Sequence, residues 1–141
     1  MANTIFITGV SSGIGRGLAA EYLEQGATVW GVSRRAPDGL LTGYSKFHFQ
    51  SVDLTDAPEV EQQLPKLLAE CEGLDTVVLN AGAIGRIADM PEVPLGDLRA
   101  LMEINVWANK TVLDSLFRQG FPVGRVISIS SGAAVTGKRG W

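Results

Sequence analysis

The stretch from Thr4 to Gly17 limits the possible folds of this chain more than any other segment. It opens with an apolar run at residues 5–7 that lacks helical spacing, which is typical of a strand buried on both faces. Glycines at positions 9, 13 and 15 follow, and apolar residues then recur at helical spacing. Glycine lets the backbone approach a ligand closely, and free N–H groups at a helix start attract negative charge. The stretch therefore predicts a dinucleotide-binding unit of strand, glycine turn and helix.

The glycine spacing also leaves a plainer interpretation open. Positions 9, 13 and 15 do not match the G-x-G-x-x-G spacing of the general dinucleotide fingerprint. Glycine-rich turns are common in loops, and the same residues could form a simple turn between a strand and a helix. The remainder of the chain has to distinguish these two interpretations.

Four further segments rich in β-forming residues predict strands. They are Thr28–Val32, Phe47–Val52, Leu74–Leu79 and Arg125–Ser130. Strands that alternate with helices indicate a parallel sheet with right-handed crossovers. The sequence therefore predicts an α/β fold with a doubly wound parallel sheet of the Rossmann type, in which these segments and the first strand make five strands. That fifth strand should form an unprotected edge with apolar surroundings, which is a hazard for aggregation.

The connections between these strands differ in length. Residues 40–46 leave room only for a short or irregular link between the second and third strands. A helix capped by Thr55 or Asp56 should run towards Glu72. Proline removes a helical hydrogen bond, so Pro65 should bend or split that helix. A longer helical pattern extends from residue 95 to near residue 120.

Composition favours one globular domain over residues 1–141, since 45% of the 141 residues are hydrophobic. The net charge of −3 gives no reason to expect a nucleic acid partner, and no basic block or long apolar run indicates a membrane. The chain leads from Met1 directly into a strand, which leaves no room for a signal peptide. Because Cys71 is the only cysteine, no internal disulfide can form, and a cytoplasmic location is expected.

No residue pattern indicates a metal site. His48 is the only histidine and lies in an alternating segment without carboxylate or cysteine neighbours, as a strand residue would. Cys71 lies at an otherwise polar helix end and is expected to be inert rather than catalytic.

Polar or glycine-rich clusters follow each of the five predicted strands. Ligands of doubly wound sheets bind outside the carboxyl ends of the strands, where the strand order reverses. Turn residues occur at strand ends in any protein, but that fact does not predict these identities. The sequence therefore predicts a nucleotide site formed by Gly9, Ser11, Ser12, Gly13, Ile14 and Gly15, by Ser33, Arg34 and Arg35, by Asp53 and Leu54, and by Asn80, Ala81 and Gly82.

The charges after the second strand bear on the choice of cofactor. A carboxylate at this place would bind the ribose 2′-hydroxyl of NAD and repel a 2′-phosphate. The chain has Ser33 there, followed by Arg34 and Arg35, and guanidinium groups suit bidentate phosphate contacts. The two arginines could also be ordinary solvated charge in a surface turn. The pattern favours NADP over NAD.

The spacing Thr8-Gly9-x-x-x-Gly13-x-Gly15 resembles the signature of the short-chain dehydrogenase/reductase family. The segment Asn80–Gly82 resembles the family's Asn-Ala-Gly, which supports the sheet beside the cofactor, and Asp53-Leu54 resembles the pair that meets the adenine ring. The resemblance implies an oxidoreductase that interconverts a carbonyl and an alcohol on a small molecule by hydride transfer. It also implies a homodimer or homotetramer formed through the helix at 95–119.

Two further matches carry catalytic roles by resemblance. Asn105 matches the helix asparagine that organises a water-linked proton path, and Ser131 matches the serine that hydrogen-bonds the substrate carbonyl. Both residues have structural alternatives. Asn105 could satisfy buried backbone groups, Ser131 could form a turn, and Ser130 competes with Ser131 for the substrate contact.

The family's general acid/base, a tyrosine in Tyr-x-x-x-Lys, has no counterpart in this chain. Tyr22 and Tyr44 belong to the first helix and to a loop, so neither matches it. The chain ends ten positions after Ser131, before the motif would occur. The resemblance therefore implies a sheet truncated after the fifth strand and a cofactor-binding portion that is inactive alone. The alternatives are a non-catalytic nucleotide-binding or regulatory relative that lacks the pair, and another doubly wound domain such as a sugar-nucleotide epimerase.

Overall fold

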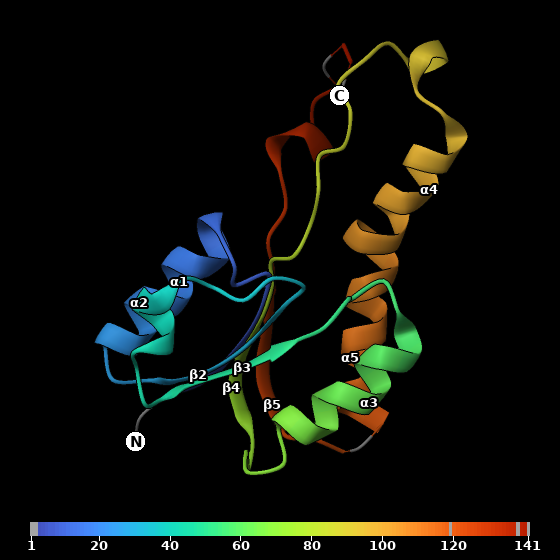
Figure 1. Cartoon of the computed structure of the whole chain (residues 1–141). Coiled ribbons are helices and arrows are strands. Elements are labelled where there is room, and N and C mark those ends of the chain that lie inside the picture. Colours follow the sequence, from blue (N-terminus) through green and yellow to red (C-terminus); the bar gives the residue numbers. More distant parts are fainter. Residues whose placement is uncertain (1–2, 119, 138, 141) are drawn as a thin grey trace.

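The computed structural model describes residues 3–118, 120–137 and 139–140. Its centre is a parallel sheet of five strands in the order β3-β2-β1-β4-β5 (Figure 1). The strands are β1 (Thr4–Thr8), β2 (Thr28–Ser33), β3 (Phe47–Ser51), β4 (Leu74–Leu79) and β5 (Val123–Ser128). The chain adds strands on one side of β1 and then on the other, so the strand order reverses between β1 and β4. The predicted doubly wound α/β fold is confirmed.

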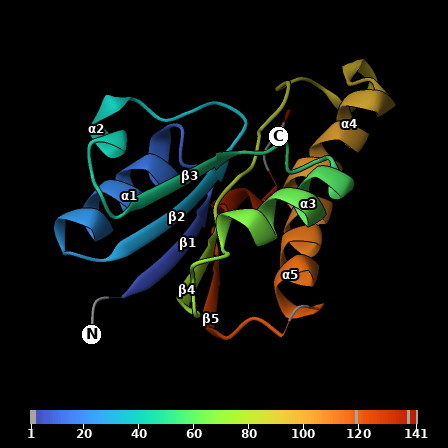
Figure 2. The same ribbon diagram turned by 60° about the horizontal axis from the view of Figure 1, so that its bottom comes forward.

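Helices cover both faces of the sheet (Figures 1 and 2). Helices α1 (Gly13–Glu24) and α2 (Gly39–Thr42) lie on one face, and α3 (Ala57–Leu67), α4 (Leu95–Met102) and α5 (Ala108–Arg118) lie on the other. Successive strand residues point to opposite faces. Ile5 and Ile7 therefore pack against α1, whereas Phe6 between them packs in the cluster formed with α3 and α5.

The short link between β2 and β3 was predicted correctly, since it contains only the four-residue helix α2. The first helix ends as expected at Gly26, which has a φ of +83°. Asp56 caps the start of α3, and its side chain accepts the N–H of Glu59 at 3.0 Å. Pro65 was expected to bend or split this helix; it does not split it, because the helix continues through Pro65 to Leu67. Pro65 lies in the last turn, where little helix remains to be interrupted.

The predicted helix from 95 to 120 contains an irregular turn. Between α4 and α5, residues Glu103–Trp107 form a π-helical turn, η2, and the helix ends before Gly120, whose φ is +65°. The fifth strand also differs from its prediction, since it begins and ends two residues earlier. It is an edge strand of the described sheet, with Val126 and Ile127 exposed at 41% and 38%.

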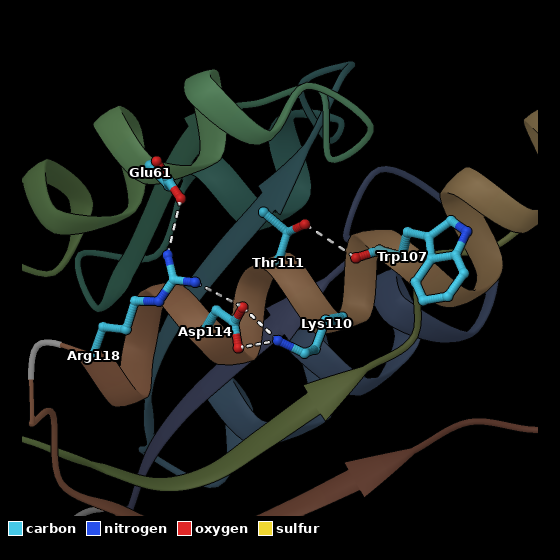
Figure 3. A network of polar contacts seen from close by, with 6 residues as sticks. All are labelled: Glu61, Trp107, Lys110, Thr111, Asp114 and Arg118. Atoms are coloured by element: carbon cyan, nitrogen blue, oxygen red, sulfur yellow. Dashed lines mark hydrogen bonds and ion pairs between the residues drawn. The ribbon is translucent and has the colours of Figure 1, made fainter.

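Charged side chains link α3 and α5 on the outer side of their face (Figure 3). Arg118 contacts Asp114 of its own helix at 3.3 Å and Glu61 of α3 at 3.4 Å. Lys110 also donates to Asp114, at 2.6 Å, and this bond lowers the pKa of that carboxyl below its usual range. All these side chains are substantially exposed, so the network contributes little to stability.

The burial of the single cysteine can be tested by its reactivity. Cys71 is buried, and this burial raises the pKa of its thiol. A raised pKa leaves less thiolate, which is the reactive species. We expect a disulfide reagent such as dithiobis(nitrobenzoate) to label the folded protein at least about ten-fold more slowly than the denatured protein at neutral pH. Equal labelling rates would contradict the buried position.

Candidate functional site

A cleft of about 820 Å³ opens at the carboxyl edge of the sheet. Its lining comes from the segments after β1, β2, β3 and β4 and from one side of α4 and η2. Thirteen of the fourteen residues predicted from the sequence to bind a cofactor line it. They are Gly9, Ser11, Ser12, Gly13, Ile14, Ser33, Arg34, Arg35, Asp53, Leu54, Asn80, Ala81 and Gly82. The four strand ends therefore form one common pocket.

Gly15 is the predicted residue that does not line this cleft. It is buried beneath the glycine turn, where a Cβ would lie 2.2 Å from the carbonyl oxygen of Gly9 and 2.4 Å from Nδ2 of Asn80. Gly9 and Gly13 have φ values of +79° and +58°, in the left-handed region that favours glycine. These three glycines allow the chain to turn tightly from β1 into α1.

The start of α1 is open towards an anion. Ser12 precedes the helix in an extended conformation, and its side chain makes no capping hydrogen bond. The first turn of α1 contains no acidic residue. The first N–H groups of a helix lack partners within the helix and carry its positive dipole end. This end can therefore receive a phosphate group.

Asn80 and Thr8 fasten the end of β4 to the glycine turn. The fully buried hydroxyl of Thr8 accepts the backbone N–H groups of Asn80 at 2.9 Å and Ala81 at 3.0 Å. The side-chain amide of Asn80 donates to the carbonyl oxygens of Thr8 at 3.1 Å and Gly9 at 3.3 Å. These bonds fix the turn at the point where the strand order reverses.

Hydrogen bonds hold the backbone of the arginine pair. The hydroxyl of Ser33 donates to the carbonyl of Arg35 at 2.7 Å, and that of Ser51 donates to the carbonyl of Arg34 at 2.8 Å. Among the ion pairs between described residues, neither arginine takes part. Asp38, the next acid along the chain, instead contacts Arg16 at 2.6 Å. Both exposed guanidinium groups are therefore free to meet a ligand.

Asp53 supplies a carboxylate at the far side of the cleft. It accepts the backbone N–H of Thr55 at 3.0 Å and the hydroxyl of the same residue at 2.7 Å. These bonds, with a smaller contribution from the charge of Arg34, lower the pKa of Asp53 below its usual range. Asp53 is therefore ionised at neutral pH and can accept hydrogen bonds from a ligand.

Asn105 lies at the centre of the π-helical turn and fixes the loop after β4. Its Oδ1 accepts the N–H of Ala83 at 2.8 Å, and its Nδ2 donates to the carbonyl of Ala83, also at 2.8 Å. The side chains of Asn109 and Thr111 donate to the carbonyl oxygens of Asn105 at 3.0 Å and Trp107 at 3.1 Å, the latter visible in Figure 3. Asn105 thus satisfies backbone groups as its structural alternative proposed, but these groups belong to the exposed Ala83 and are not buried. The role of Asn105 in a proton path stays a prediction.

Ser131 lines a second cavity of about 380 Å³, which shares Ala83, Ile84 and Leu101 with the first cleft. Its hydroxyl accepts the N–H of Ala133 at 3.2 Å and begins a short 3₁₀ turn, η3 (Gly132–Ala134). The turn-forming role is therefore also observed. Ser130 is absent from the described lining of both cavities, as are Tyr22 and Tyr44.

Sequence reasoning missed several residues that line the first cleft or support it from beneath. The predicted site left out the anchoring hydroxyl of Thr8, although Thr8 belongs to the glycine motif. It also left out the apolar residues of α4 and η2 that close the cleft, because helical spacing alone does not show which neighbour a helix meets. These residues are Ala100, Leu101 and Ile104.

Two general findings apply to the part of the chain that the structure describes. Within it, no three histidine, cysteine or acidic side chains lie together in a way that could hold a metal ion. None of its helices is long and apolar enough to cross a membrane.

The doubly wound parallel sheet with its glycine turn defines a Rossmann-type α/β fold. A model of the family described as short chain dehydrogenase matches residues 3–141. The chain belongs to this family.

Similar proteins include a "NADPH-dependent 3-dehydrocapnine reductase" of Ornithobacterium rhinotracheale, which is 32% identical over 92% of this chain and 49% of its own length. A "Benzil reductase ((S)-benzoin forming)" of Bacillus subtilis (strain 168) is 33% identical over 96% of this chain and 57% of its own. The solved structure of a short-chain dehydrogenase from Streptomyces avermitilis superposes with a TM-score of 0.88 at 31% identity, over 99% of this chain and 53% of that one. The chain thus spans about half the length of the curated relatives it matches.

Proposed function

We propose that this chain is the cofactor-binding portion of an NADP-preferring oxidoreductase that interconverts a carbonyl and an alcohol by hydride transfer. The observation that carries the proposal is the common cleft. It unites the glycine turn, the arginine pair, Asp53 and Asn80 at the reversal of strand order. Membership of the short-chain dehydrogenase family and the similarity to an NADPH-dependent reductase add support.

The residues of the cleft fit a dinucleotide. Gly15 lets the glycine turn close tightly beneath the cleft, and the uncapped start of α1 suits the pyrophosphate. Arg34 and Arg35 would hold a 2′-phosphate, and Asp53 with Leu54 would meet the adenine. When bound, the nicotinamide supplies or accepts the hydride. The protein binds it, orients it and shields it from water.

Residues near the presumed nicotinamide end would handle the substrate. Ser131 would orient the carbonyl oxygen through its hydroxyl, and Asn105 would support proton transfer while it holds the loop at Ala83. The protein is expected to work in the cytoplasm as a homodimer or homotetramer that pairs through α4, η2 and α5. The exposed fractions of Met102, Trp107 and Phe117 along these helices, 47%, 51% and 54%, support such a contact.

A non-catalytic nucleotide-binding relative is the second candidate. Neither Tyr22 nor Tyr44 is among the described lining residues of the two cavities, so neither can serve as the family's acid/base. Both candidates predict that NADPH binds. The two candidates differ in the activity expected of a protein that contains this chain and a Tyr-x-x-x-Lys motif. If the oxidoreductase proposal is correct, that protein oxidises NADPH when a ketone is added. A decrease in the absorbance of NADPH measures this reaction.

Replacing Arg34 with aspartate tests the cofactor preference. The variant loses a guanidinium and gains a charge that repels the 2′-phosphate, so we expect NADPH affinity to fall about ten- to a hundred-fold. NADH affinity should stay constant or rise, because a carboxylate there can bind the 2′-hydroxyl. Titrations of nicotinamide fluorescence measure both affinities.

The matched control is Arg99→Asp, the same charge change at an exposed arginine of α4 outside the described cleft lining. It should leave the ratio of NADPH to NADH affinity unchanged. An Arg34→Asp protein that binds NADPH as tightly as the parent would contradict the proposed preference, and a parent that binds neither nucleotide would contradict the proposed function.

A further inference from the structure

The second cavity lies beside the proposed cofactor cleft and has a different character. Its volume of about 380 Å³ is at the small end of the range for small-molecule sites. Most of its described lining is apolar and comes from the loop after β4, from α4 and from the segment after β5. These apolar side chains are Ile84, Ile87, Met90, Val93, Leu98 and Leu101.

Arg86 is the one charged side chain among the described residues that line this cavity. It is exposed and takes part in none of the ion pairs between described residues. The polar Ser131 lines the same cavity. The space thus combines an apolar body, a hydroxyl and a positive charge.

The structure shows why a nearby acid does not neutralise this arginine. Asp89, three positions further along the loop, accepts two hydrogen bonds from Arg139, at 2.9 Å to Nε and 2.6 Å to Nη2. This bidentate pair lowers the pKa of Asp89. Together with the bond from the N–H of Ala88 to the carbonyl of Gly140 at 3.2 Å, it ties the loop to the segment after β5. The carboxylate of Asp89 is consequently committed to Arg139.

We propose that Arg86 selects substrates that carry a carboxylate, so that the site takes small oxo acids or hydroxy acids with an apolar chain. This inference rests on the proposed function, because it makes the second cavity the substrate site. A neutral ketone whose carbonyl oxygen meets Ser131 displaces water from the guanidinium and has no second acceptor to replace it. A carboxylate replaces that water with charge-assisted, bidentate hydrogen bonds. Arg86 therefore acts as a specificity-determining residue.

Binding of matched ketones tests the proposal without catalysis. The protein is saturated with NADP⁺, so that a ketone can bind but cannot be reduced, and is titrated calorimetrically with 2-, 4- and 5-oxohexanoate and with neutral 2-hexanone. The three oxo acids differ in the distance between the ketone carbonyl and the carboxylate, so together they test which separation fits the site. We expect at least one acid to bind about five- to ten-fold more tightly than 2-hexanone, since an exposed arginine keeps part of its water.

Variants assign the preference to Arg86. Arg86→Gln should abolish the preference for the acid and leave NADPH affinity unchanged, because Arg86 is not among the described lining residues of the cofactor cleft. Arg86→Lys should keep part of the preference for the acid. Arg99→Gln removes the same charge outside the described linings of both cavities and should keep the whole preference. Circular dichroism verifies that each variant is folded.

The outcomes distinguish failure of the proposed function from failure of the role proposed for Arg86. A parent protein that binds no NADPH contradicts the proposed function. A parent that binds NADPH but binds all four ketones within about two-fold of one another overturns the role of Arg86 alone. So does an acid preference that survives in Arg86→Gln.

Discussion

Replacing Gly15 with alanine is expected to destabilise the protein by about 3 kcal/mol or more and to abolish nucleotide binding. The added Cβ would lie 2.2 Å from the carbonyl oxygen of Gly9 and 2.4 Å from Nδ2 of Asn80. The first of these atoms is backbone, and the second belongs to a side chain that is itself hydrogen-bonded to the turn. Relief of the overlap must therefore move the turn that forms the proposed phosphate site. Urea denaturation measures the stability, and NADPH fluorescence measures the binding.

Gly17→Ala is the matched control for this substitution. Gly17 lies in the same helix, two residues further on, and a Cβ there meets no atom within 4 Å. Alanine is favoured over glycine inside helices, so we expect this variant to gain up to about 1 kcal/mol of stability and to keep its NADPH affinity. If the two variants lost equal stability, general loss of glycine in α1 and not the overlap would be responsible.

Replacing Thr8 with valine is expected to lower the free energy of unfolding by about 2–4 kcal/mol. Valine has nearly the same shape as threonine but cannot accept a hydrogen bond. The backbone N–H groups of Asn80 and Ala81 would both lose the acceptor that they share in the parent protein. Because Thr8 is fully buried, the change leaves little room for a replacement water. Chemical denaturation measures the loss.

Two controls separate the hydrogen bonds from packing. Thr8→Ser keeps the oxygen and removes one methyl group, so it should cost only about 1 kcal/mol. Thr28→Val makes the same chemical change at the half-buried start of β2 and should be nearly neutral. A smaller loss for Thr8→Val than for Thr8→Ser would contradict the role assigned to the hydroxyl.

Much of the fold follows from local patterns in the sequence. Strand β4 was predicted with its observed bounds because its β-forming residues lie between the turn residues Gly73 and Asn80. The glycine ends of α1 and α5 were predicted for the same kind of reason, since Gly26 and Gly120 adopt the positive φ that other residues avoid. Such signals depend on the backbone preferences of a few adjacent residues.

Errors arose where non-local packing outweighs a local rule. Pro65 was expected to bend or split α3, yet the helix is not split, and the buried residues Val60 and Leu64 hold one face of it in the core up to its last turn. The π-helical turn around Asn105 could not be predicted from helical spacing. Its asparagine bonds to Ala83, which is distant in sequence and reaches it only through the fold.

Local sequence patterns were enough to predict the strands and most residues of the candidate cofactor cleft, because parallel strands bring their carboxyl ends to one edge of the sheet. Local patterns could not show which of the charged residues and glycines face the cleft and which are buried beneath it or paired with other side chains. The tertiary structure placed Gly15 beneath the turn, paired Asp38 with Arg16, and committed Asp89 to Arg139. These choices depend on contacts between segments far apart in the chain, which the identity of a residue and its neighbours does not specify.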